Sequence, residues 1–426
     1  MRCTIFALGT RGDVEPLIAL GVGLKTAGLD VRFASQRDFA ATVEQHGLES
    51  FPIEGQSSSF FRGAAGIALR ERMQSNADFQ RFFDNYLSLG FSRILNDFWA
   101  ASRDADVVLA WMNGAQPIAE RLGVAVFVCG ICPVPHWPTG AFSNPYLGSA
   151  PDPPSWLANR RTWRANETAA KVGESVLNKW RCDTLGLPST SWREDLARMR
   201  RLPHLLGYSP SVLPRPRDWK PWVHVTGYWF LSDPRAYQPP PELQAFLDAG
   251  PPPLGVGFSS LVGRNPAGVT NAVIDALAQA GQRAVLLTGL GGLKGVAFPD
   301  HVFPVAAVPH DWLFPRISAM VHHGGAGTTG MAMRSGLPQL GVPFGYDQTL
   351  WANQIHALGV GPAAIPVESI TAERLAPALR EVASNPRMRD RAAAVSASVR
   401  SEDGIGTAVS IILEAADRRA ARVTVS

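Results

Sequence analysis

The chain has 426 residues, of which 46% are hydrophobic and 18% charged, a composition typical of a globular protein long enough for two domains. The formal net charge is only +4, and no cluster of Lys or Arg forms a stripe, so the sequence gives little support to nucleic-acid binding. This small excess leaves two kinds of partner open: anionic small molecules and, through peripheral contact, an anionic membrane surface.

Strands and helices alternate in the first part of the chain. Continuous apolar runs predict strands buried on both faces, and helical periodicity predicts a helix over 16–27, closed by Gly28, and another over 38–46. The predicted strands cover residues 3–8, 29–35, 106–111 and 124–130. This alternation is typical of parallel βαβ units in a doubly wound sheet.

A proline-rich stretch at 203–253 predicts a connector, and the alternation resumes beyond it. The expected strands there lie at 254–260, 283–289, 319–323 and 338–343, with helices over 266–280 and from about residues 325 and 346. We therefore predict an α/β protein with two Rossmann-like, doubly wound parallel-sheet domains that face each other across a cleft. The expected boundaries are 1–230 for the N-terminal domain, 231–253 for the linker, 254–405 for the C-terminal domain and 406–426 for a terminal helix and tail.

The stretch VHHGGAGTTG, residues 321–330, places glycines and hydroxyl side chains where a predicted strand gives way to a helix. Free backbone N–H groups at a helix start form an anion site, and glycines let a phosphate approach the backbone. Histidine and threonine side chains add donors at the same junction. The candidate anion-binding residues are His322, His323, Gly324, Gly325, Gly327 and Thr328. The competing interpretation is a glycine-rich turn with structural histidines.

Asp13 lies in GTRGDVEP, just beyond the first predicted strand, where a cleft between the domains must open. A carboxylate there can act as a general base, and burial would raise its pKa toward that task. The same residue could instead cap the N-terminus of the following helix. Its position alone leaves both interpretations open.

Two other motifs are interpreted as structural. Asp104 and Asp106 form a D-x-D pair of the kind that holds a metal in many nucleotide-sugar enzymes, but this pair precedes its strand instead of following it. We therefore interpret it as a solvated strand start and predict no metal. Cys129 and Cys132 are interpreted as a strand-to-loop pair of thiols, because no second pair lies at a spacing suited to zinc.

The sequence from 308 to 361, VPHDWLFPRISAMVHHGGAGTTGMAMRSGLPQLGVPFGYDQTLWANQIHALGVG, closely resembles the donor-binding region of the family 1 glycosyltransferases. It is most similar to the sterol 3-β-glucosyltransferase and the glycopeptide or macrolide glycosyltransferase branches. GTRGDVEPLIALGVGLKTAGLDVRFA (9–34), VTGYW (225–229) and GFSSLVGRNP (257–266) are similar too, so the resemblance covers nearly the whole chain. It implies a GT-B fold, with the acceptor bound in the first domain and the nucleotide sugar in the second.

The resemblance also implies roles for single residues. Trp312 would stack on the nucleotide base, Ser260 and the turn from His322 to Thr328 would hold the diphosphate, and Asp347 and Gln348 would hydrogen-bond the sugar hydroxyls. Asp13 would be the catalytic base. One departure is GLGGL at 289–293, where related chains often read GWGGL; Leu290 replaces the tryptophan.

A surplus of aromatic residues between 60 and 99 predicts a broad apolar pocket in the acceptor domain. The residues assigned to the acceptor are Phe60, Phe61 and Phe83 from this stretch, Trp137 from a proline-rich loop, and Arg11 beside Asp13. Such a pocket suits a sterol, a polyketide or a similar lipophilic alcohol.

The expected function is inverting, metal-independent transfer of a hexose, most simply glucose from UDP-glucose, with no cofactor beyond this co-substrate. A dTDP-deoxysugar transferase of antibiotic biosynthesis is the main alternative; a nucleotide-sugar epimerase and a non-catalytic partner of a glycosyltransferase are further ones. No apolar run reaches the roughly 18 residues of a spanning helix, and the N-terminal run is too short for a signal peptide, so the expected location is cytoplasmic.

Overall fold

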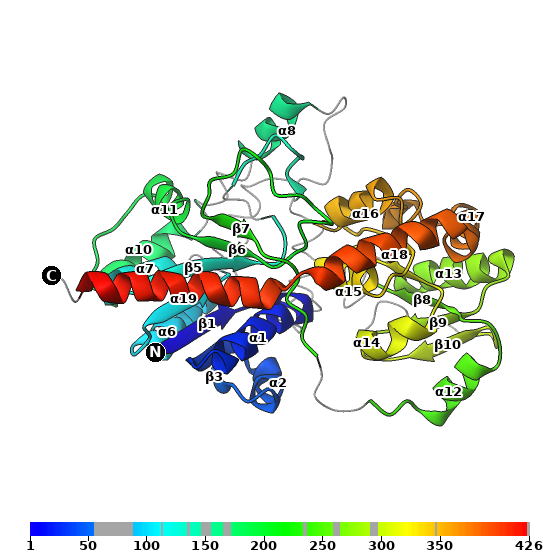
Figure 1. The fold of residues 1–426 in the computed structure, drawn as a ribbon, viewed down its shortest axis with the longest axis horizontal. Coiled ribbons are helices and arrows are strands. Elements are labelled where there is room, and N and C mark those ends of the chain that lie inside the picture. Colours follow the sequence, from blue (N-terminus) through cyan, green and yellow to red (C-terminus); the bar gives the residue numbers. More distant parts are fainter. Residues whose placement is uncertain are drawn as a thin grey trace.

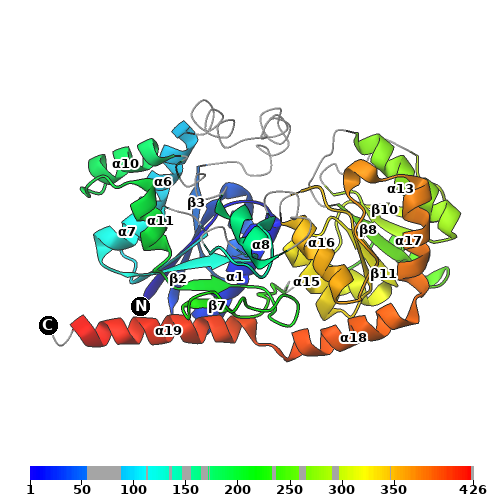
Figure 2. The same ribbon diagram turned by 90° about the horizontal axis from the view of Figure 1, so that it is seen from above.

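The computed structural model of the chain describes residues 1–54, 88–111, 114–133, 137–145, 155–164, 171, 173–232, 237–258, 265–289, 297–345 and 347–423. Two parallel sheets form its frame, and helices cover both faces of each (Figure 1 and Figure 2). This confirms the predicted fold class. Among the described residues, no helix combines the length and the apolar character needed to cross a membrane.

The first sheet has seven parallel strands in the order β3-β2-β1-β4-β5-β6-β7, the order of a Rossmann-like sheet with one strand added. Its strands are β1 (Arg2–Ala7), β2 (Asp30–Gln36), β3 (Glu49–Ile53), β4 (Val107–Ala110), β5 (Ala125–Gly130), β6 (His204–Leu206) and β7 (Val223–Val225). The helices of this half are α1 (Arg11–Thr26), α2 (Ala40–Gln45), α6 (Ser88–Ser102), α7 (Ala115–Leu122), α8 (Trp156–Thr162), α10 (Glu174–Asp183) and α11 (Trp192–Met199), with a 3-10 turn η1 (Arg37–Phe39).

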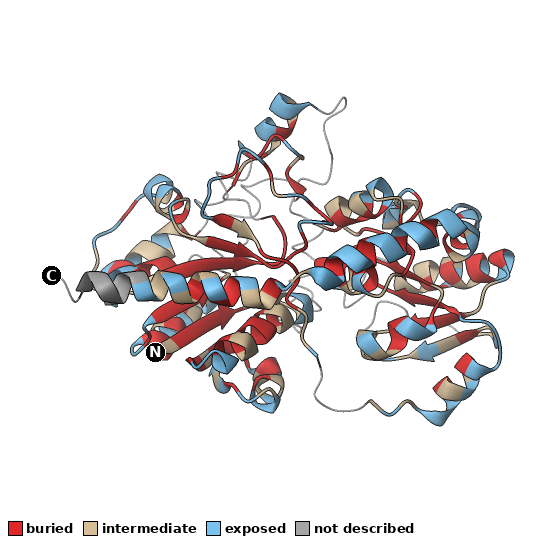
Figure 3. Ribbon diagram, viewed as in Figure 1, coloured by how far each residue is buried: buried red, intermediate tan, exposed pale blue. Residues whose placement is uncertain are grey.

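Strand β1 shows why its sequence is continuously apolar. Ile5 points into the core under α1, whereas the adjacent Phe6 points to the opposite face and stacks on Phe98 of α6 at a ring-centroid distance of 4.1 Å. Because alternate residues of a strand face opposite ways, both sets must be apolar when helices cover both faces. The buried residues follow the strands through the centre of each domain (Figure 3).

The second sheet has five parallel strands in the order β10-β9-β8-β11-β12, the same Rossmann-like pattern. Its strands are β8 (Leu254–Gly257), β9 (Ala284–Leu287), β10 (Val302–Val305), β11 (Ala319–His322) and β12 (Gln339–Gly341). The accompanying helices are α12 (Pro241–Asp248), α13 (Pro266–Ala280), α14 (His310–Leu313), α15 (Ala326–Arg334), α16 (Gln348–Ala357), α17 (Ala372–Ser384), α18 (Pro386–Ser401) and α19 (Gly404–Val423), with 3-10 turns η5 (Phe314–Arg316) and η6 (Val367–Ser369).

The chain crosses between the domains twice. After α18, helix α19 returns to the N-terminal domain and packs Ala408, Val409 and Ile412 into its core beside α1 (Figure 2). At the crossing, Ser209 donates a hydrogen bond to Glu402 at 2.7 Å, and Trp229 Nε1 donates to the carbonyl of Gly404 at 3.2 Å. These contacts hold the two domains together at the base of the cleft.

The prediction of a connector at 203–253 was wrong in part. Strands β6 and β7 lie in this stretch and extend the first sheet, and α12 packs Leu243 and Leu247 into the core of the second domain. Strands β3 and β10 were not predicted either. β6 and β7 have only three residues each and lie among prolines, so the local pattern carries too little signal to predict them.

Candidate active site

Asp13 lies in the first turn of α1, immediately after the carboxyl end of β1. The backbone N–H and the hydroxyl of Thr10, the residue that caps α1, donate to Asp13 Oδ2 at 2.8 and 3.0 Å. Gly9 has a φ of +134°, and a Cβ built on it would come within 2.4 Å of that oxygen. The turn therefore needs glycine at position 9 so that the carboxylate can fold back onto Thr10.

The environment of Asp13 is partly apolar. Burial raises the pKa of Asp13 above its usual range, and the two hydrogen bonds from Thr10 oppose this rise because they stabilise the charged form. The capping and general-base interpretations therefore coexist in one geometry: Oδ2 caps the helix, and among the described residues no group donates to Oδ1. That second oxygen is available for a proton.

His322 ends β11 and is fully buried. Its Nδ1 accepts a hydrogen bond from the N–H of Gly324 at 3.1 Å, so Nε2 carries the proton and donates to Oε1 of Gln339 at 2.9 Å. Burial lowers the pKa of His322 to about 4, so the ring is neutral. Both ring nitrogens are thus used within the protein. The prediction that His322 donates to a diphosphate was wrong; the side chain holds the shape of the loop.

His323 has a different environment. Its ring lies against Gly325, where a Cβ would come within 2.3 Å of Nε2. Burial, and then the nearby His322 and His310, lower its pKa to about 3, and Nδ1 is buried without a hydrogen-bond partner among the described residues. A neutral ring with one unused polar atom leaves the predicted role in donor binding in place as a prediction.

Helix α15 begins directly after this loop, with Gly325 as its capping residue. The first intrahelical bond is donated by Thr329, so the N–H groups of 326–328 lack partners within the helix. Gly327 is exposed with open space beside it, and Thr328 is partly exposed. The predicted anion site is therefore accessible at a helix N-terminus, with the positive end of the dipole behind it.

The turn after β12 brings Asp347 and Gln348 beside this loop. Gly324, with a φ of +82°, approaches so closely that a Cβ would lie 2.6 Å from the carbonyl oxygen of Gln348. Gln348 is buried, and its Oε1 accepts from the N–H of Phe344 at 2.8 Å. The fold thus brings together two predicted sets of donor-binding residues that are about twenty positions apart in the sequence.

Asp347 faces the other domain. Its Oδ2 accepts a hydrogen bond from Trp351 Nε1 at 3.0 Å. Burial raises the pKa of Asp347 to about 6, and the negative charge of Asp13 adds to the rise. The two carboxylates, one from each domain, therefore lie within electrostatic reach of one another across the interdomain cleft. Helices α1 and α15 also contact each other there.

Trp312 and Arg11 lie on the two sides of this region. The guanidinium of Arg316 lies over the Trp312 ring at 4.2 Å, and Tyr237 meets it edge-on at 5.2 Å, so a nucleotide base would use the remaining face. Arg11 is exposed and pairs with Glu15 at 2.7 Å. Its charge adds to the effect of burial in lowering the pKa of His310 to about 4, which places Arg11 toward the donor domain. The predicted acceptor role of Arg11 stays a prediction.

The structure does not support Trp137 as a wall of an acceptor pocket. Trp137 is buried, its ring meets His204 edge-on at 5.6 Å, and its carbonyl accepts a hydrogen bond from Trp219 at 3.1 Å. Packing on all sides makes it a core residue. Four other predicted site residues, Ser260, Phe60, Phe61 and Phe83, and also Leu290, lie outside the described residues.

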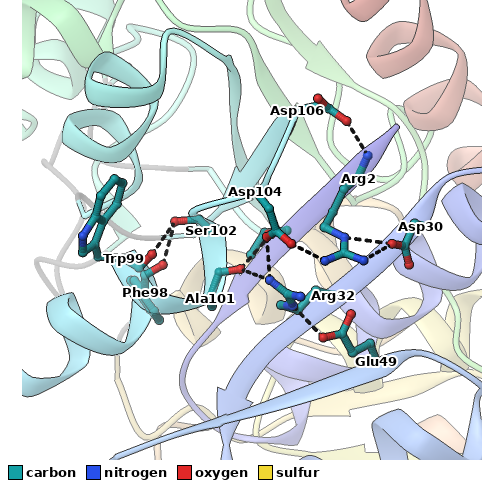
Figure 4. Close-up of polar contacts among 11 residues, drawn as sticks. Arg2, Asp30, Arg32, Glu49, Phe98, Trp99, Ala101, Ser102, Asp104 and Asp106 are labelled. Atoms are coloured by element: carbon teal, nitrogen blue, oxygen red, sulfur yellow. Dashed lines mark hydrogen bonds and ion pairs between the residues drawn. The ribbon is translucent and has the colours of Figure 1, made fainter.

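The D-x-D pair is structural, as predicted. Arg2 and Arg32 both pair with Asp104, and the backbone N–H of Arg2 donates to Asp106 at 2.7 Å (Figure 4). Partial burial acts against this, but the hydrogen bond and charge of Arg32, with help from Arg2, lower the pKa of Asp104. These ion pairs tie together the amino ends of β1, β2 and β4, at the opposite edge of the sheet from Asp13. The thiols of Cys129 and Cys132 are both buried, in agreement with the structural interpretation.

Sequence reasoning missed the residues that position the site. Gln339 sets the tautomer of His322 from 17 positions away, and Trp351 holds Asp347. The one available signal was the T-x-x-D spacing of Thr10 and Asp13, which matches the pattern of a helix capping box.

Comparison with known proteins agrees with this geometry. Residues 3–102 match the model of the glycosyltransferase family 28 N-terminal domain, and residues 272–414 match that of the erythromycin biosynthesis protein CIII-like C-terminal domain. The chain is 34% identical to a sterol 3-beta-glucosyltransferase of Pichia angusta over 96% of its own length and 33% of that protein. A second sterol 3-beta-glucosyltransferase, from Aspergillus clavatus, is 32% identical over 97% of this chain and 29% of its own length. The chain thus spans about a third of the curated relatives it matches.

Solved structures share the fold over the whole chain. The glycotransferase of kitacinnamycin superposes with a TM-score of 0.72 at 18% identity, covering 97% of this chain and 98% of that one. The glycosyltransferase VinC, in complex with dTDP, gives a TM-score of 0.63 at 20% identity, covering 98% of this chain and all (100%) of that one. The two family models, the sterol glucosyltransferase relatives and this two-domain fold together show that the chain belongs to the family 1 glycosyltransferases with the GT-B fold.

Proposed function

We propose that the protein is an inverting, metal-independent glycosyltransferase that moves glucose from UDP-glucose to a hydroxyl group of a lipophilic acceptor such as a sterol or a polyketide. One observation carries the proposal. A base with a raised pKa, Asp13, and a helix N-terminus with free amides, that of α15, come from different domains and contribute to one interdomain cleft. A carboxylate for the sugar, Asp347, borders the same cleft.

The proposed reaction is a single displacement. Oδ1 of Asp13 removes the proton from the acceptor hydroxyl, whose oxygen forms a bond to the anomeric carbon of the sugar. The bond from that carbon to the phosphate oxygen breaks at the same time, and the electron pair leaves with the nucleoside diphosphate. Attack from the face opposite the leaving group inverts the configuration. Oδ2 stays bound to Thr10, so the carboxylate keeps its orientation throughout.

The leaving group gains negative charge as the bond breaks. We place it at the start of α15, where unpaired N–H groups and the helix dipole stabilise it without reorganisation. These donors supply the positive potential that a divalent cation supplies in enzymes of the D-x-D type. His322 contributes by holding Gly324 in place, and Asp347 with Gln348 would bind sugar hydroxyls.

The identity of the donor rests on the relatives. The sterol relatives are named as 3-beta-glucosyltransferases, which supports glucose. The second candidate is a dTDP-deoxysugar, supported by the full-length likeness to VinC bound to dTDP. The sterol relatives also support a lipophilic alcohol as acceptor. A non-catalytic auxiliary protein would be expected to lose Asp13 or the Asp347–Gln348 pair, and this chain has all three residues.

The deciding experiment measures binding and slow hydrolysis of UDP-glucose, dTDP-glucose and dTDP-deoxysugars, and then screens lipophilic alcohols with the best donor. Preference for UDP-glucose and a β-linked product from an α-linked donor would support the proposal. Preference for a dTDP-deoxysugar would favour the second candidate. Binding of none of these donors would contradict both and favour the auxiliary role.

A further inference from the structure

Helix α8 projects from the segment that links β5 to β6 and stands away from both sheets (Figure 1). One face of it is fixed to the domain. Asn159 Nδ2 donates to the carbonyl of Gly140 at 3.1 Å, and the Thr162 hydroxyl accepts from the N–H of Asn144 at 2.7 Å. The fully buried Trp163, just after the helix, donates from Nε1 to the carbonyl of Phe142 at 3.1 Å. The helix therefore has a defined orientation.

The opposite face carries large apolar side chains into solvent. Trp156 is 55% exposed and Leu157 is 52% exposed, the two highest values among the large hydrophobic residues that the structure describes. The Trp156 ring rests against Gly140, where a Cβ would come within 2.1 Å of it, so its exposure is not that of a loose side chain. Figure 3 shows the helix as mostly exposed. Ordered, exposed, adjacent Trp and Leu residues need an explanation beyond the fold of the monomer.

The rest of this face is positive. Arg160, Arg161 and Arg164 follow the apolar pair at helical spacing, all of them exposed, and α8 contains no acidic residue. Arg160 lies over the Trp156 ring at 5.2 Å and reaches Asp218 only at 3.5 Å. Within the described part of the chain, Arg161 and Arg164 have no ion-pair partner. The exposed face thus combines an apolar tip with two unpaired cations.

We propose that this face of α8 docks on the surface of an anionic lipid bilayer, with Trp156 and Leu157 inserted at the headgroup level and the arginines on lipid phosphates. Tryptophan is enriched at membrane–water interfaces, and clustered basic side chains are attracted by anionic lipids. A specific protein interface would need a far larger apolar area than two side chains supply. The cationic charge beside the apolar tip therefore favours a lipid surface over a protein partner.

Docking at α8 would also orient the molecule. The β5–β6 segment starts at the carboxyl edge of the first sheet, the edge that carries Asp13. A molecule held by α8 would keep this edge near the bilayer, where lipophilic alcohols dissolve. The docking inference itself does not depend on the proposed activity.

The test is sedimentation of the full chain with vesicles. We expect binding to vesicles of equal parts phosphatidylcholine and phosphatidylglycerol at low salt, weaker binding as salt screens the charges, and little binding to phosphatidylcholine alone. The double variant Trp156→Ser/Leu157→Ser should lower partitioning by about tenfold or more. Arg161→Glu should lower it by roughly fivefold or more. Arg387→Glu, an equal charge change on the exposed surface of α18, is the matched control and should have little effect.

Unchanged thermal melting and donor binding in each variant would exclude misfolding as the cause. The inference is overturned if the wild-type chain does not bind the anionic vesicles, or if the double variant binds them normally. Equal losses from Arg161→Glu and Arg387→Glu would also overturn it, because binding would then follow net charge and not α8. A wild-type dimer that the double variant dissociates, without vesicle binding, would assign this face to a second copy of the chain.

Discussion

Thr10 donates two hydrogen bonds to the same oxygen of Asp13, one from its backbone N–H at 2.8 Å and one from its hydroxyl at 3.0 Å. Both bonds favour the ionised carboxylate, against the burial that disfavours it. The pair thus orients the proposed base and limits the rise of its pKa. This relationship is the basis of the first two predictions.

Replacing Thr10 by Val removes the hydroxyl donor and keeps the backbone N–H. The pKa of Asp13 should rise further, because its charged form loses a stabilising bond. Since the base must be deprotonated, the acidic limb of the rate profile should move to higher pH. Turnover at the acidic end should fall by about tenfold, given that a hydrogen bond to a charged group contributes roughly 1.5–3 kcal/mol. Thr10→Ser restores the donor and should restore the profile; an identical acidic limb in Thr10→Val would contradict the role.

Asp13→Asn keeps the shape of the side chain and an oxygen that can accept from Thr10, but removes the base. We expect turnover to fall by about 10²–10⁴, the usual contribution of a general base. Nucleotide affinity, measured by calorimetry, should be nearly unchanged, because the donor loop lies on the other domain. Turnover close to that of the wild type would remove Asp13 from the mechanism.

Gly324→Ala tests the coupling of the donor loop to α16. The new Cβ would lie 2.6 Å from the carbonyl oxygen of Gln348, at a φ of +82°. We expect a loss of about 2–4 kcal/mol of stability from strain and overlap, together with weaker nucleotide binding. Gly281→Ala is the control in the same domain, since it has a positive φ of +63° but nothing within 4 Å. It should cost about 1 kcal/mol, measured by denaturant unfolding, and leave binding intact. Equal effects of the two variants on binding would argue against the coupling.

Buried histidines make stability depend on pH. Burial lowers the pKa of His204 to about 4, well below its unfolded value near 6.5. The unfolded chain therefore takes up this proton first as the pH falls, so the contribution to stability is complete above 6.5 and is lost toward pH 4. His310, His322 and His323 behave in the same direction.

His204→Phe should flatten this dependence. The melting temperature of the variant should fall less steeply than that of the wild type between pH 6.5 and about 4.5, because one of the proton uptakes is gone. The variant also loses the bond from His204 to the carbonyl of Leu202, at 2.9 Å, so its melting temperature at pH 8 should be lower. Trp137→Phe changes the ring that His204 touches without removing a titrating group, and should keep the wild-type slope. Parallel slopes for His204→Phe and the wild type would sink the linkage.

The strands and helices of the two sheets were predictable because their signals are local. The apolar run at 3–8 and the helix over 266–280 correspond to β1 and α13, the latter with the same bounds. Strands β6 and β7 were not predictable in the same way. Their three-residue lengths carry no periodicity, and they are strands only because β5 offers an edge for β6 and β6 one for β7.

The sequence by itself determined the alternation of elements, the family resemblance, and the placing of Asp13 and the glycine-rich turn beyond the carboxyl ends of strands. These depend on residue spacing, which a single chain displays. The tertiary structure decided which side chains are left for a ligand: it gave both ring nitrogens of His322 to Gln339 and Gly324, packed Trp137 into the core, and brought Asp347 within electrostatic reach of Asp13. Such pairings join residues far apart in the chain, and burial sets their energies, so only the folded arrangement determines them.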